Sequence, residues 1–130
     1  MRLVMDVGAH PAQVGQARRI VAEHLVEWGL DGDTRDVAVL LVSELVTNAL
    51  QHGRQPMRLV ADNGPDTLRV EIYDGGDGRP AIRPVRADEP GGRGLRLVDA
   101  LATRWETTLG PDGKCVWFEL DTKGAEHERA

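Results

Sequence analysis

The most extended pattern of apolar and polar positions covers residues 37–53 and predicts one long helix. At about 100° per residue, the apolar residues fall on one side of this helix, and the polar residues of its second half fall on the other. The apolar side comprises Ala38, Val39, Val42, Leu45, Val46, Ala49 and Leu50. The polar side comprises Ser43, Glu44, Thr47, Asn48, Gln51 and His52.

Glu44 and Asn48 lie one turn apart on the polar side of this helix. A helix with so many apolar residues is expected to be buried, and a buried carboxylate needs a partner. We therefore treat Glu44 and Asn48 as candidate site residues. The alternative for this pattern alone is an ordinary solvated helix face.

Shorter patterns predict the other elements of the chain. They favour an edge strand over residues 2–7, a helix over 11–29, strands over 58–62 and 67–73, a helix over 94–102, and strands over 103–109 and 114–120. Asp33 or Thr34 is the expected N-cap of the long helix. In the helix over 94–102, the residues expected to face the core are Leu97, Val98 and Leu101.

This order of elements predicts an α+β fold, a two-layer sandwich whose helices cover one face of a mixed, largely antiparallel sheet. The chain has 130 residues, which suits a single domain over residues 1–130. We expect its core at about residues 10–120 and a polar tail over 121–130.

Composition narrows the class of protein. Apolar residues make up 41% of the chain, charged residues make up 28%, and the net charge is −5. With few aromatic residues and no basic stripe, we expect no nucleic-acid partner. Cys115 is the only cysteine, which excludes an internal disulfide. No apolar run approaches the ~20 residues that span a bilayer, and no signal peptide is evident, so we expect a cytoplasmic protein that does not enter the membrane.

The strand over 67–73 leads into a second candidate motif, Asp74-Gly75-Gly76-Asp77-Gly78. A carboxylate fixed at a strand end can accept a hydrogen bond from an amino group. Gly76 and Gly78 would let the backbone approach a flat ligand closely. Alone, this pattern is more typical of a turn. It opens a long irregular segment, residues 75–93, of a kind that is usually functional or disordered.

A third motif, Gly91-Gly92-Arg93-Gly94-Leu95, precedes the helix over 94–102. Glycines before a helix N-terminus favour anion binding, because free N–H groups and the helix dipole point at the ligand. The motif is not a Walker sequence, because no Gly-Lys-Ser/Thr follows, and it does not directly follow a strand as a Rossmann fingerprint does.

These three motifs in this order resemble the Bergerat-fold ATP-binding family, which includes gyrase, heat-shock chaperone, mismatch-repair and histidine kinase ATPases. The resemblance covers about residues 10–120. The segments SELVTNALQHG and GGRGLRLVDALATRW are most similar to anti-sigma-factor serine kinases. Only about 35 residues precede the first motif, which argues against a complete histidine kinase.

The resemblance implies a role for each motif. Glu44 would be the general base, and Asn48 would ligate a Mg²⁺ ion bound to the phosphates of ATP. Asp74 would accept a hydrogen bond from the adenine amino group. The pocket for the base would be shaped by Gly76 and Gly78, and the phosphates would be bound by Gly92, Arg93, Gly94 and Leu95. Residues 79–91 would form a lid.

One departure from the family concerns the last hairpin. Many relatives carry a Thr there that supports the adenine-binding Asp, and the equivalent of Gly-Lys-Thr in this chain is Gly113-Lys114-Cys115. Because a thiol is a weaker hydrogen-bond donor than a hydroxyl, we expect Cys115 to alter the adenine contacts.

The leading hypothesis is an ATP-binding regulator that binds a sigma factor or an anti-anti-sigma factor and phosphorylates a serine on the latter. A second is a non-catalytic nucleotide-sensing module, in which ATP orders the lid and changes partner binding. A third is an interaction domain with degenerate motifs. Relatives of this type often pair as dimers, and residues 1–7 are expected to supply an interface strand for a homodimer.

Overall fold

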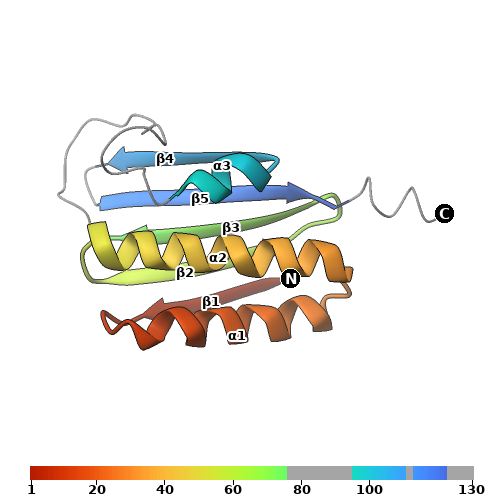
Figure 1. Cartoon of the computed structure of the whole chain (residues 1–130), viewed down its shortest axis with the longest axis horizontal. Helices are drawn as coiled ribbons and strands as arrows, with labels where there is room; N and C mark the ends of the chain where they lie inside the picture. Colours follow the sequence, from red (N-terminus) through yellow and green to blue (C-terminus); the bar gives the residue numbers. More distant parts are fainter. Residues whose placement is uncertain (76–94, 111–112, 123–130) are drawn as a thin grey trace.

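One five-stranded sheet carries the helices of the described part of the chain on one of its faces (Figure 1). This arrangement is seen in a computed structural model, which describes residues 1–75, 95–110 and 113–122. The strands are β1 (Arg2–Val7), β2 (Met57–Asn63), β3 (Thr67–Asp74), β4 (Arg104–Gly110) and β5 (Gly113–Asp121). The helices are α1 (Ala12–Glu27), α2 (Gly32–His52) and α3 (Arg96–Leu101).

The strand order is β1-β2-β3-β5-β4. Both hairpins, β2-β3 and β4-β5, are antiparallel, and so are the pairings of β1 with β2 and of β3 with β5. The predicted α+β two-layer sandwich is confirmed. The expectation of a mixed sheet is wrong for the described strands, because each pair of neighbouring strands among them is antiparallel. β3 and β4 run in the same direction, but β5 lies between them and pairs antiparallel with both.

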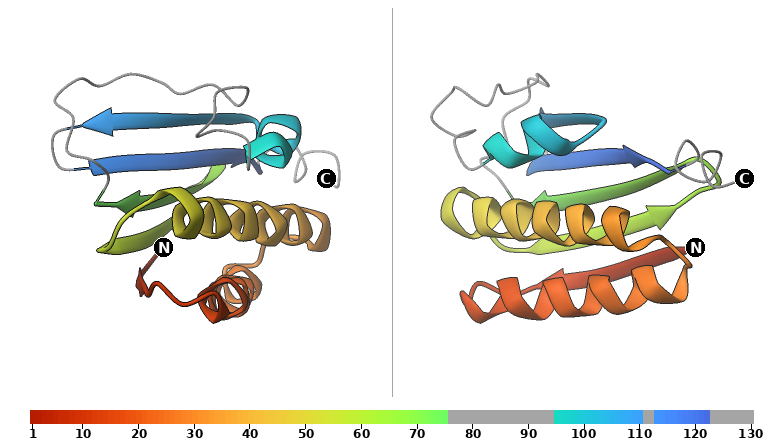
Figure 2. Two further views of the ribbon diagram at one scale, coloured as in Figure 1. Left: turned by 60° about the vertical axis from the view of Figure 1, so that its left-hand side comes forward. Right: turned by 45° about the vertical axis from the view of Figure 1, so that its right-hand side comes forward.

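The core lies between the sheet and the helices α1 and α2, which pack side by side (Figure 2). Alternate residues of each strand point into it, because side chains in a strand alternate between the two faces. Its largest fully buried members include Leu25, Leu41, Leu45, Leu59, Ile72 and Phe118. The long α2 packs on the central strand β3 and on its neighbour β5. The end of α2 lies against the end of β3, where Gly53 meets Asp74.

Two details of the helices differ from the sequence predictions. The N-cap of α2 is Asp31, whose Oδ1 accepts a 2.7 Å hydrogen bond from the backbone N–H of Thr34, so the prediction of Asp33 or Thr34 as the cap is wrong. In α3, Val98 is buried as predicted, but Leu97 and Leu101 are 39% and 43% exposed. Because α3 has only six residues, fewer than two turns, few of its side chains can face the core, and Val98 is the buried one.

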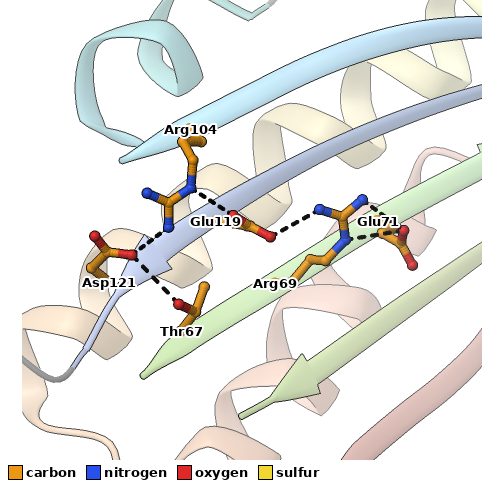
Figure 3. A network of polar contacts seen from close by, with 6 residues as sticks. All are labelled: Thr67, Arg69, Glu71, Arg104, Glu119 and Asp121. Atoms are coloured by element: carbon orange, nitrogen blue, oxygen red, sulfur yellow. Dashed lines mark hydrogen bonds and ion pairs between the residues drawn. The ribbon is translucent and has the colours of Figure 1, made fainter. Parts of the chain in front are cut away.

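The opposite face of the sheet carries a ladder of charged side chains (Figure 3). Glu119 joins Arg69 and Arg104 at 2.9 and 2.7 Å, Arg69 also pairs with Glu71, and Arg104 also pairs with Asp121. The Arg69 guanidinium carbon lies 4.0 Å from the centre of a Trp117 ring. Polar residues on this face and apolar residues on the other explain the period-two pattern of the strands.

No helix in the described part of the chain is long and apolar enough to cross a membrane.

Candidate functional site

The site forms where the last turn of α2 meets the end of β3. Gly53 is the C-cap of α2, and its backbone N–H donates to Ala49 O at 2.7 Å. A Cβ atom built on Gly53 would lie 2.7 Å from Oδ2 of Asp74, the last residue of β3. Real Cβ atoms do not approach another atom so closely, so the absence of a side chain at Gly53 allows the Asp74 carboxylate to pack against the helix end.

Asp74 is 5% exposed, and its side chain shares the inward face of β3 with Ile72, Val70 and Leu68. Burying a carboxylate without compensating contacts is costly. The resemblance assigns this residue to the adenine amino group, and the structure gives it the matching physical character of a hydrogen-bond acceptor at the boundary of the core.

Asn48 lies on α2 five residues before Gly53, the residue that packs against Asp74, and it is 2% exposed. In the described part of the chain its Oδ1 atom is buried without a hydrogen-bond partner. Such an oxygen normally finds a donor or a cation, because a buried unpaired acceptor costs about 1–3 kcal/mol. Amide oxygens are among the ligands that Mg²⁺ accepts, so the chemistry of this residue fits the predicted metal ligand.

Glu44 lies one turn before Asn48 on α2 and is half-buried. The neighbouring Ser43 donates from its hydroxyl to the backbone carbonyl of Val39 at 3.1 Å. Because Glu44 is only half-buried, its carboxylate retains access to solvent, and it lies on the same helix face as Asn48. This position suits a group that exchanges protons with a bound reactant.

Lys114 is the β5 residue beside Asp74. The strand register pairs Asp74 with Lys114, and Lys114 Nζ lies 3.7 Å from Asp74 Oδ2. The two side chains are 13% and 0% exposed. From the sequence, Lys114 is only the middle residue of Gly113-Lys114-Cys115, and no role was predicted for it. The period-two alternation of β5 was the available signal, but the register against β3 was needed to use it.

Cys115, the residue expected to alter the adenine contacts, lies on the opposite face of the sheet. The register pairs it with Tyr73 on one side and Thr108 on the other. Burial, and secondarily the charge of Glu71, raises the pKa of the Cys115 thiol to about 12. Lys114, and not Cys115, is therefore the β5 residue beside Asp74, because adjacent residues of a strand point to opposite faces.

Gly113 brings the start of β5 close to the end of β3. Its φ of +134° is in the region that favours glycine, and a Cβ atom there would lie 2.1 Å from the backbone oxygen of Asp74. The backbone N–H of Gly75 donates to Arg54 O at 2.7 Å, which ties the segment after Asp74 to the segment after α2. These contacts gather α2, β3 and β5 around one carboxylate.

The remaining predicted residues are mostly outside the described part of the chain. This holds for Gly76, Gly78, Gly92, Arg93 and Gly94, and for the expected lid over residues 79–91. Leu95 is described, and it is 1% exposed next to α3. Its side chain belongs to the core, which leaves only its backbone for the predicted phosphate contact.

A hollow of about 550 Å³ lies over the ends of β1, β2 and β3. Its lining comprises Asp6, Pro56, Met57, Arg58, Val60, Tyr73, Asp74 and Gly75. Arg58 and Tyr73 are paired neighbours on the face that the helices do not cover. Most of this hollow therefore lies on the other side of the sheet from Asn48.

Comparison with known proteins adds two findings. A family model described as a histidine kinase-like ATPase domain matches residues 7–120. Among solved structures, the crystal structure of the RsbU and RsbW domains of Rv1364c from Mycobacterium tuberculosis is similar to this chain, with a TM-score of 0.72 and 21% identity over 92% of this chain. The chain spans 32% of that protein's chain, and at this identity the likeness shows a common fold. A search of curated proteins finds no match.

Proposed function

The chain belongs to the histidine kinase-like ATPase domain family, and we propose that it is an ATP-binding regulator of the anti-sigma-factor type. The observation that carries this proposal is the packing of the Asp74 carboxylate against the end of α2, the helix that holds Glu44 and Asn48. In this proposal, the residue that binds the base is on β3 and the metal ligand and general base are on α2, so that all three roles fall on two elements that meet at one point.

For nucleotide binding, we assign Asp74 to the amino group of adenine. A buried carboxylate accepts a hydrogen bond from an amino group and repels the carbonyl oxygen that guanine carries at the same position. An unpaired buried polar group costs about 1–3 kcal/mol, which predicts a preference for ATP over GTP of about tenfold or more.

For the phosphates, we assign Asn48 Oδ1 to Mg²⁺ and the segment 92–95 to the phosphate oxygens. When bound there, Mg²⁺ neutralises phosphate charge. This ion usually takes few ligands from the protein, so one amide oxygen together with phosphates and waters is sufficient. A metal site built only from acidic, histidine or cysteine side chains finds no support, because no group of three such residues occurs in the described part of the chain.

For the reaction, we propose transfer of the γ-phosphoryl group to a serine hydroxyl of an anti-anti-sigma partner. Glu44 accepts the hydroxyl proton as the bond from the serine oxygen to phosphorus forms and the bond from phosphorus to the ADP oxygen breaks. Phosphoryl transfer depends mainly on positioning and charge neutralisation, and a placed base contributes about 10²–10⁴ in rate. Binding of a sigma factor to the same protein is the second part of this proposal, and the fold shared with a structure containing an RsbW domain supports it.

Calorimetry with Mg²⁺ present tests the nucleotide assignment. The wild type should bind ATP at least about tenfold more tightly than GTP, and Asp74→Asn should lose most of this preference because its amide replaces an acceptor with a donor. The matched control is Asp62→Asn, the same change in an acidic residue of β2, the strand next to β3. Asp62 pairs with Arg2 of β1 at 2.7 Å and has no assigned contact with the nucleotide. Absence of ATP binding by the folded wild type would contradict the proposal.

The second experiment separates the kinase from a nucleotide-sensing module. Purified protein, ATP and a candidate anti-anti-sigma partner are combined, and phosphoserine on the partner is measured by mass spectrometry. Phosphoserine formation supports the kinase. ATP-dependent partner binding without phosphoserine supports the nucleotide-sensing alternative.

We further propose that a second copy of the chain is a partner and pairs along β1. This strand is at one end of the sheet, and Val4 within it is 50% exposed. Met1, which precedes the strand, is 66% exposed. An edge strand presents backbone groups that another strand can pair with. Sedimentation should show a dimer that Val4→Lys weakens, and a strict monomer at high concentration would contradict this proposal.

A further inference from the structure

Lys114 and Asp74 form a buried pair of opposite charges at the place assigned to the edge of the base. The ammonium nitrogen lies 3.7 Å from Asp74 Oδ2, and the side chains are 13% and 0% exposed. This separation is longer than the 2.7–3.2 Å of a typical N–H···O hydrogen bond. The opposite charges attract each other at this distance, but the ammonium does not form a hydrogen bond of normal length to Oδ2 of Asp74. Its N–H groups can therefore donate to a ligand.

The two side chains have complementary hydrogen-bonding characters. An ionised carboxylate only accepts hydrogen bonds, and an ammonium group only donates them. The Watson–Crick edge of adenine, by which proteins read an unpaired base, presents a donor, the amino group, next to an acceptor, the ring nitrogen N1. An acceptor and a donor side by side on the protein match this edge in the same order.

We propose that Lys114 is a specificity-determining residue that donates a hydrogen bond to N1 of adenine while Asp74 accepts one from the amino group. This inference rests on the proposed nucleotide binding and adds a second contact to the base. The pairing of Asp74 with Lys114 across β3 and β5 places the two groups on one face of the sheet, and Gly113 holds the start of β5 against the Asp74 backbone.

The neighbouring side chains do not offer the same donor. Cys115 is on the other face of the sheet, where it is paired with Tyr73 and Thr108. Gly53, which packs against the carboxylate from α2, has no side chain. Among the described residues that flank Asp74, Lys114 is therefore the one with a charged donor directed at the same oxygen.

The test compares ATP with 1-deaza-ATP, in which a C–H group replaces N1. Calorimetry is performed on the wild type, Lys114→Met and, as a matched loss of a cation, Arg19→Met on the exposed surface of α1. The wild type and Arg19→Met should bind 1-deaza-ATP about tenfold or more weakly than ATP, the loss expected for a hydrogen bond from a charged donor. Lys114→Met should bind ATP more weakly than the wild type and should bind the two nucleotides equally.

A purely structural role for Lys114 gives a different pattern. Lys114→Met would then weaken both nucleotides by the same factor and keep the wild-type ratio between them, which would overturn the inference. A nucleotide lacking the amino group, purine riboside triphosphate, provides a second readout: its loss of affinity should persist in Lys114→Met and vanish in Asp74→Asn.

The two proposals fail in distinguishable ways. If the wild type binds no ATP, the proposed nucleotide binding is wrong, and the role of Lys114 falls with it. If ATP binds with the predicted dependence on Asp74 while Lys114→Met keeps the penalty for 1-deaza-ATP, only the role of Lys114 is wrong. Thermal unfolding of each variant without nucleotide identifies any variant that fails to fold, and Lys114→Thr, which shortens the side chain and keeps a weaker donor, then replaces Lys114→Met.

Discussion

Gly53 and Asp74 are in contact in a way that only a residue without a side chain permits, because a Cβ atom on Gly53 would lie 2.7 Å from Asp74 Oδ2 and 2.7 Å from Ala49 O. The Ala49 oxygen belongs to the backbone of α2 and cannot move aside easily. The carboxylate must move in any variant with a side chain at this position. The end of α2 therefore helps to set where the Asp74 acceptor lies.

Replacement of Gly53 by Ala should weaken both folding and nucleotide binding. Overpacking of this kind costs about 1–3 kcal/mol of unfolding free energy, and displacement of Asp74 should lower ATP affinity by about tenfold. Gly15 on α1 is the matched control, because a Cβ atom there meets nothing within 4 Å. Gly15→Ala should raise stability by about 0.5–1 kcal/mol and leave ATP affinity unchanged. Urea unfolding and calorimetry measure both effects, and normal ATP affinity in Gly53→Ala would contradict the assignment.

Replacement of Asn48 by Leu should separate stability from binding. The buried Oδ1 atom of Asn48 has no hydrogen-bond partner in the described part of the chain. Its removal should raise the unfolding free energy by about 1–3 kcal/mol while Mg²⁺-dependent ATP binding falls by more than about tenfold. Thr47→Leu, at the adjacent half-buried position, is the control for the change in size. A large loss of stability in Asn48→Leu would show that the amide is satisfied in the folded protein.

Replacement of Glu44 by Gln should reduce phosphoryl transfer without preventing ATP binding. The amide keeps the size of the side chain and removes the base, so partner phosphorylation should slow by about 10²–10⁴. Calorimetry should show ATP affinity within about twofold of the wild type, because Glu44 is not assigned to the nucleotide. An unchanged rate of phosphorylation would exclude Glu44 as the base.

Cys115 should be unreactive in the folded protein and unimportant for nucleotide binding. Its raised pKa of about 12 leaves little thiolate at pH 8, so alkylation by iodoacetamide should be at least about a hundredfold slower than in the unfolded chain. Since the folded state holds the proton more tightly, the contribution of this thiol to stability is constant below about pH 9 and is lost as the pH rises toward 12.

Cys115→Ser tests both statements about the thiol. Without the thiol, this variant should lose less unfolding free energy than the wild type as the pH rises from 9 toward 12. It should bind ATP as the wild type does, because residue 115 faces away from Asp74. A clear loss of ATP affinity would restore the interpretation that this position supports the adenine-binding carboxylate.

Asp31 should contribute more to α2 than Asp33 does. Asp31 Oδ1 accepts a 2.7 Å hydrogen bond from the Thr34 backbone, so Asp31→Ala should cost about 1 kcal/mol of unfolding free energy. Asp33 lies in the first turn, where a negative charge contributes about 0.3–1 kcal/mol through the helix dipole. Urea unfolding of both variants measures the difference, and a larger effect at Asp33 would contradict the observed cap.

Much of the fold followed from local periodicity. The pattern over residues 37–53 predicted α2 and the apolar side that it buries, since neighbouring residues alone set which side chains share a helix face. The alternation over residues 67–73 predicted β3 and placed Asp74 at its end for the same reason. The candidate residues Glu44, Asn48 and Asp74 were therefore available from the sequence, together with the family resemblance.

Contacts between distant segments were decided only by the tertiary structure. Which residue of β5 faces Asp74 depends on a strand register, and a shift of one residue exchanges Lys114 for Cys115. The packing of Gly53 on Asp74 joins a helix end to a strand end, and no spacing along the chain encodes it. Periodicity reports which side of an element a residue occupies, whereas the partner on that side is set by how whole elements pack, and for this reason the role of Lys114 emerged only from the assembled sheet.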